Sequence, residues 1–174
     1  MKLHKWIALT MLVVMFGACT VRQVQESQPL EKNAKWAVLP VVNLAEVPMA
    51  GENIETMLDS ALRIRGIVDL QRQTGVSPSK SGLLLDDRQR YELALKNAAQ
   101  QDTQYGITGA VHEWRYKTGL DGEPAVGLTL QVVELPSGQV LWTASGAKTG
   151  WGYSNVSGTA EKLVVQLLKG LTLQ

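Results

Sequence analysis

The stretch YGITGAVHEWRYKTGLDGEPAVGLTLQVVELPSGQVLWTASGAK, from Tyr105 to Lys148, decides the fold of this chain. Every second residue in its middle part is apolar, which predicts a strand with one buried face: Val126, Leu128, Leu130 and Val132. Turn-forming residues at 119–124 and 136–138 bound this strand. We therefore expect three consecutive strands, over 105–116, about 126–132 and 140–148. Trp142 alternates with Val140 and Ala144, which predicts a core position for the indole.

The residues before this stretch predict a strand, a helix and a second short strand. The apolar run Trp36–Asn43 is typical of a buried strand, in which Pro40 must occupy an edge or a bulge because it has no N–H to donate. A helix ending at Gly66 is expected next, because apolar residues recur with helical spacing at Ile54, Met57, Leu58, Ala61 and Leu62. Residues 67–70 should form a short strand and 74–82 a loop.

Two further helices complete the predicted fold. Asp86 and Gln89 have the spacing of a capping box, and one apolar face follows them: Tyr91, Ala94, Leu95 and Ala98. A last helix starts near Thr159 and carries an apolar stripe up to Leu171. The element order is then β-α-β-α-β-β-β-α. We predict a single α+β domain over residues 36–174, in which helices pack on a mixed β-sheet.

The first 35 residues have the pattern of an exported, lipid-anchored protein. Lys2 and Lys5 precede an apolar run that is too short to span a bilayer and that ends in Phe16-Gly17-Ala18-Cys19. This pattern predicts a signal peptide over 1–18 and a lipid on Cys19; the alternative is an ordinary secretory signal with a chance cysteine. Residues 19–35 then read as the lipidated cysteine and a flexible polar tether. In the lipoproteins that this start resembles, Asp after the cysteine favours the inner membrane, so Thr20 indicates the outer membrane.

Composition excludes several classes of function. Once residues 1–18 are removed, the 16 acidic side chains exceed the 15 basic ones, so no basic excess is left to bind nucleic acid. Cys19 is the only cysteine and His112 the only histidine of the mature chain, which argues against metal sites. His112 lies mid-strand beside Trp114, where a hydrogen-bonded structural histidine is favoured over a catalytic base. We expect no enzyme activity and no cofactor beyond the covalent lipid.

Two surface features have more than one interpretation. Trp151 and Tyr153 alternate with glycine in the loop before the last helix, an arrangement typical of side chains at a membrane interface or against a sugar face. Trp151 could equally fold back onto its own domain. Asp121 and Glu123 lie at the tip of a predicted hairpin, where acids are ordinary turn residues. In a ring of identical subunits, the same acids would form a charged collar.

Several segments together resemble a known family. KWAVLPVVN over 35–43, a helix beginning near Gly51, YGITGAV over 105–111 with its hairpin, and GQVLWTAS over 138–145 resemble the lipoproteins related to the curli secretion subunit CsgG. CsgG is much longer because it adds transmembrane hairpins, for which this chain has no room. The chain is most similar to the barrel-less PelC-like lipoproteins of Pel polysaccharide export.

The resemblance implies a homo-oligomeric ring, reported as dodecameric, on the periplasmic face of the outer membrane. Its implied partners are the anionic membrane surface, a cationic polysaccharide and the separate outer-membrane barrel protein PelB. An aromatic belt would face the lipid, with Trp151 as its residue here, and an acidic funnel would guide the polymer, with Asp121 as the candidate and Glu123 beside it. Two other roles stay open: a monomeric lipoprotein that activates a periplasmic cell-wall synthase, and a structural part of another envelope secretion machine.

Overall fold

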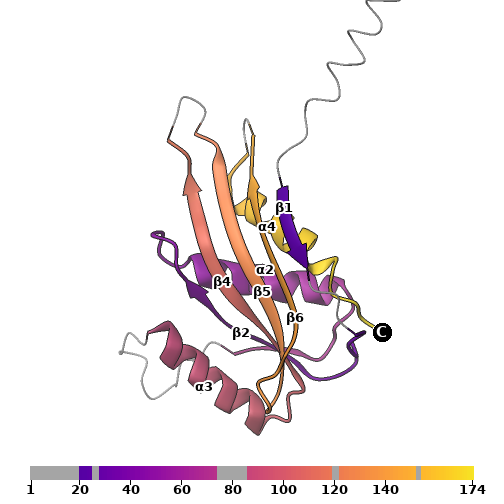
Figure 1. Ribbon diagram of the computed structural model, residues 1–174. Coiled ribbons are helices and arrows are strands. Elements are labelled where there is room, and N and C mark those ends of the chain that lie inside the picture. The colour runs from indigo at the N-terminus through magenta and orange to yellow at the C-terminus, as the bar shows by residue number, and fades with distance from the viewer. Residues whose placement is uncertain (1–19, 25–27, 74–85, 119–121, 152–153) are drawn as a thin grey trace, which may run out of the picture.

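The protein folds around one six-stranded mixed β-sheet (Figure 1). The computed structural model describes residues 20–24, 28–73, 86–118, 122–151 and 154–174. The strands lie side by side in the order β1-β6-β5-β4-β2-β3. Strand β2, next to the edge strand β3, runs parallel to both β3 and β4, and the remaining pairs are antiparallel. The strand bounds are β1 Thr20–Val24, β2 Trp36–Asn43, β3 Leu70–Arg72, β4 Tyr105–Tyr116, β5 Pro124–Glu134 and β6 Val140–Thr149.

The helices cover the two faces of the sheet unequally. Helices α2 (Ala50–Ile64) and α4 (Val156–Leu168) pack on one face and enclose the main core, which includes the fully buried Trp36 and Trp142. Helix α3 (Asp87–Gln100) covers only one end of the opposite face (Figure 1). The long antiparallel strands therefore extend past α3 and leave part of that face open.

The predicted fold class is confirmed, and the predicted order of elements is confirmed from β2 onward. All three long strands of the Tyr105–Lys148 stretch form, and Asp86 caps α3 by accepting a 2.7 Å hydrogen bond from the Gln89 N–H. Several boundaries differ from the prediction: β5 extends two residues further at each end, and α4 ends at Leu168, before the predicted limit at Leu171. Helix α4 starts at Val156 because the Asn155 side chain caps it through the Gly158 N–H, and β3 forms three residues later than expected.

Pro40 lies at a bulge, as its missing N–H requires. The register between β2 and β4 shifts between Val38 and Val41, and the Pro40 carbonyl accepts a 2.6 Å hydrogen bond from the Thr108 hydroxyl. The N-terminus of α2 lies against this bulge, at Gly51. A Cβ atom there would lie 2.4 Å from the Val41 carbonyl oxygen, so glycine is required for this approach.

The prediction of a flexible tether is wrong for two parts of residues 19–35. Thr20–Val24 forms the edge strand β1 and pairs antiparallel with β6. Leu30 is buried and exchanges backbone hydrogen bonds with the C-terminal residues Thr172 and Gln174. The ordered domain therefore begins at Thr20, not at Trp36. The predicted signal peptide and Cys19 lie outside the described residues and stay predictions.

The alternation that placed Trp142 in the core holds for only part of its strand. Trp142 and Ala144 are buried, but Val140 is exposed. The register between β5 and β6 shifts between Val132 and Val133, opposite the start of β6. This irregularity ends the strict period of two, so Val140 does not share the buried face.

Candidate functional site at the anchor end of the sheet

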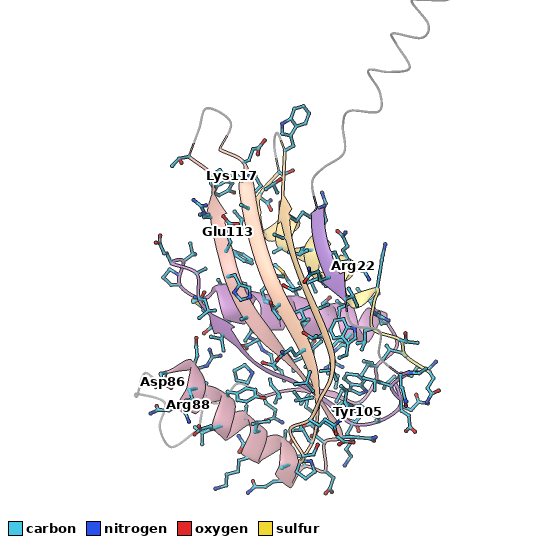
Figure 2. The ribbon with its side chains drawn as sticks, viewed as in Figure 1. Arg22, Asp86, Arg88, Tyr105, Glu113 and Lys117 are labelled. Atoms are coloured by element: carbon cyan, nitrogen blue, oxygen red, sulfur yellow. The ribbon has the colours of Figure 1, made fainter. Side chains whose placement is uncertain are left out.

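Four strands end together on one side of the sheet, which we call the anchor end because β1 begins there. The backbone register pairs Thr20 with Lys148, Ala125 with Thr149, and Tyr116 with Pro124. The start of β1, the end of β6, the start of β5 and the end of β4 thus meet. Helix α3 lies at the other end (Figure 1). Figure 2 shows Lys117 just past the anchor end of β4 and Tyr105 at the opposite end of that strand.

Trp151 projects from the anchor end. The Gly150 N–H donates a 2.8 Å hydrogen bond to the Pro124 carbonyl, and the Trp151 carbonyl accepts bonds from the Ser154 N–H and hydroxyl. These bonds hold the backbone at Gly150 and at Trp151, while the Trp151 side chain is 71 % exposed. The indole therefore lies outside the buried core of its own domain. Tyr153 lies outside the described residues.

The β4–β5 hairpin stands at the same end. Glu123 faces Lys117 across it, with their charged groups 3.8 Å apart and the Lys117 N–H bonded to the Glu123 carbonyl. A surface ion pair of this length stabilises little, but it partly neutralises the acid. Tyr116 is the last residue of β4, and its side chain is more than half exposed. It adds a second aromatic ring at this end, which was not predicted from the sequence. Asp121 lies outside the described residues.

His112 contributes to a polar row across the open face of the sheet. Its Nε2 lies 2.8 Å from the Thr129 hydroxyl, which in turn lies 3.1 Å from the Ser145 hydroxyl. The bonds link β4, β5 and β6, as expected for a hydrogen-bonded structural histidine. The observed partner of the imidazole is a hydroxyl and not the carboxylate that would orient a catalytic base.

The described residues offer neither a metal cluster nor a membrane-spanning helix. No group of three or more His, Cys, Asp and Glu side chains in the described ranges has the geometry to hold an ion. None of the helices in those same ranges is both long enough and apolar enough to cross a bilayer.

Comparison with known proteins places the fold in one family. No family model and no curated protein sequence matches the chain. Among solved structures, the chain is similar to the PelC dodecamer from Paraburkholderia phytofirmans, with 33 % identity and a TM-score of 0.74 over 90 % of this chain and 100 % of that one. A second crystal structure, of a single-substitution variant of the same dodecamer, gives a TM-score of 0.75.

The chain belongs to the PelC family. A more distant likeness joins it to lipoprotein GNA1162 from Neisseria meningitidis, at 16 % identity and a TM-score of 0.60 over 78 % of this chain and 96 % of that one. That likeness shows a shared fold only. The PelC relative is matched over its whole length.

Proposed function

We propose that this chain is a periplasm-facing outer-membrane lipoprotein that assembles into a ring and guides a cationic polysaccharide to an export barrel, PelB. The observation that carries this proposal is the 33 % identity to a dodecameric PelC over 90 % of the chain. In this function the chain catalyses no reaction. It positions a polysaccharide that other proteins synthesise, and its charged side chains guide that polymer. Its only attached group is the lipid on Cys19.

The anchor end of the sheet is the surface that we assign to the membrane. Cys19 immediately precedes β1, so acyl chains on it insert beside the ends of β1 and β6. The exposed indole of Trp151 follows three residues after Lys148, the partner of Thr20. Tryptophan favours the headgroup level of a bilayer, and a lipidated protein gains firm binding from a second contact of this kind. Tyr153 is proposed as a further belt residue.

The acidic hairpin is proposed to act where the polymer leaves the ring. Asp121 and Glu123 belong to the β4–β5 hairpin at the anchor end, next to the membrane and therefore next to a barrel in that membrane. Repetition in each subunit multiplies these charges, and low-dielectric walls focus their field. Because Lys117 pairs with Glu123, Asp121 is expected to carry most of the effect.

Charge substitution at the hairpin tests the proposal. We expect Asp121→Lys to lower secreted polysaccharide and to raise periplasmic polymer while the ring still assembles, and Asp121→Asn to do so more mildly. Glu26→Lys, in the segment between β1 and β2, is the matched control. Secreted and periplasmic polymer are measured beside the oligomeric state in detergent. Equal export from all three variants would remove the hairpin from the proposal, and a parent protein that stays monomeric would contradict the ring.

A further inference from the structure

An apolar groove lies between α2 and α4, on surfaces that these helices do not use against the sheet. It has a volume of about 570 Å³ and is lined mainly by Met57, Ala61, Ile64, Val164, Val165 and Leu168. Ile64 at its rim is 83 % exposed. Exposed apolar surface of this kind in a folded domain marks a contact surface.

Polar contacts hold this groove in shape. The Arg65 guanidinium, at the C-cap of α2, donates to the backbone carbonyls of Leu168 and Leu171 at the end of α4. A cation at this place also stabilises the helix C-terminus. Partial burial lowers the pKa of Arg65 from its usual value, and the group stays charged at neutral pH. Lys169 adds a second cation beside the end of α4, and the acid Glu161 lines the groove two turns earlier on that helix, so the groove combines an apolar floor with a basic end at the helix C-termini.

A second exposed apolar patch lies at the other end of α2. The loop 44–49, between β2 and α2, exposes Leu44 and Met49 by 61 % and 65 %, with Val47 between them. The loop is well defined: the Asn43 side chain donates to the Val47 carbonyl and accepts from the Ala45 N–H. Met49 has a φ of 61°, a strained conformation for a side chain other than glycine. The loop also carries the exposed acid Glu46.

We propose that loop 44–49 of one subunit docks into the α2–α4 groove of the next subunit around the ring. This proposal rests on the proposed function, because it requires a closed ring. A ring of identical chains needs a head-to-tail contact, in which two different patches of one chain are complementary. The 15 residues of α2 separate the loop at its start from the groove along its C-terminal half by up to about 22 Å (Figure 1).

Charge and chemistry are complementary between the two patches. The apolar side chains of the loop match the apolar floor of the groove, as anchors at the centre of an interface do. Glu46 supplies an acid where the groove presents Arg65 and Lys169, which fixes the orientation of the contact.

The test uses the lipidated protein in detergent. Leu44→Lys and Ile64→Lys each place a charge in one patch, while Val68→Lys, at an apolar residue that is 81 % exposed and outside both patches, is the matched control. We expect the first two to be monomeric with unchanged melting temperatures, and the control to keep the ring, as measured by light scattering. A mixture of the Leu44 and Ile64 variants contains one intact loop and one intact groove, so it should form dimers but no ring.

A charge exchange makes the test specific. Glu46→Lys should weaken assembly several-fold, and combination with Lys169→Glu should restore it. Rings formed by both Leu44→Lys and Ile64→Lys would overturn the docking proposal and leave the ring itself intact. A parent protein that is monomeric at all concentrations would instead contradict the proposed function.

Discussion

The carboxylate of Glu55 is buried on α2, with 1 % of the residue exposed, and groups from three other elements bind it. The Val41 N–H of β2 donates to it at 3.1 Å, Arg72 of β3 at 3.2 Å and Arg90 of α3 at 3.1 Å. Arg90 also contacts Glu52 and Asp87, and Asp87 accepts from the Asn43 N–H. These carboxylates occupy the edge of β2 beyond the short strand β3, so that edge is closed to further strands.

Loss of this carboxylate should destabilise the fold strongly. We expect Glu55→Ala to lower the free energy of unfolding by about 3 kcal/mol, the low end for a broken buried ion pair, because Arg90 keeps two other carboxylates and Arg72 reaches water. Glu92→Ala removes the exposed ion pair with Arg88 and should change the free energy of unfolding by less than about 0.5 kcal/mol. Urea unfolding measures both. Equal effects of the two substitutions would contradict the role assigned to Glu55.

Trp151 should matter for export and not for stability. Its exposed indole makes Trp151→Ala nearly neutral for unfolding, within about 0.5 kcal/mol, while secreted polysaccharide falls because a membrane contact is lost. Trp114→Ala, at a buried indole, is the control and should cost about 3–5 kcal/mol. Thermal melting and polysaccharide secretion are measured for both. A large loss of stability in Trp151→Ala would show that this side chain supports the fold.

At the scale of elements, β1 gives the most direct test of the revised boundary. In an antiparallel pair, successive N–H groups point alternately toward and away from the partner strand. Proline at two adjacent exposed positions, Arg22→Pro and Gln23→Pro, must therefore remove one hydrogen bond to β6 in one variant and none in the other. We expect about 1 kcal/mol of destabilisation in one variant only. Two neutral variants in urea unfolding would show that β1 is not paired in solution.

The sequence predicts the elements whose patterns are internal and misses those that depend on a distant partner. The alternation in β5, the apolar stripe of α4 and the cap at Asp86 are local signals, and each gave the correct element. Strand β1 has only five residues, and it forms because it pairs with the edge of β6, far away in the sequence. No local sequence pattern indicates such a pairing.

The candidate site shows the same division between features that have a local sequence signal and features that depend on distant contacts. The residues around Trp151 left an exposed ring and a ring folded onto its own domain equally open, and in the structure the side chain is largely exposed. Tyr116 was missed because only the strand register brings the end of β4 beside the start of β5 and the end of β6. The hydrogen bonds and ion pairs of Glu55 were missed because they join residues 14 to 35 positions apart.

At the scale of the whole molecule, a lipid on Cys19, as proposed, would be joined directly to β1, with no flexible segment between the lipid and the sheet. A flexible tether would let the domain move away from the bilayer, whereas in the proposed function the pairing from Thr20 onward would hold the anchor end against it. In the proposed function, orientation would follow from connectivity: the β4–β5 hairpin and Trp151 would face the membrane, and α3 would point into the periplasm. A ring built from such subunits would rest flat on the membrane without a separate orienting partner.

Ten glycine and serine residues inserted between Cys19 and Thr20 should therefore impair export without releasing the protein. Such a linker spans about 17 Å as a coil, so the anchor end could leave the headgroup layer while the lipid stays inserted. The same ten residues inserted within 25–27, between β1 and β2, leave the anchor distance unchanged and form the control. We expect both variants to fractionate with the outer membrane and only the first to secrete less polysaccharide. Equal secretion from both would mean that the short connection to the lipid does not position the ring, and that Trp151 and its neighbours hold the anchor end on the membrane by themselves.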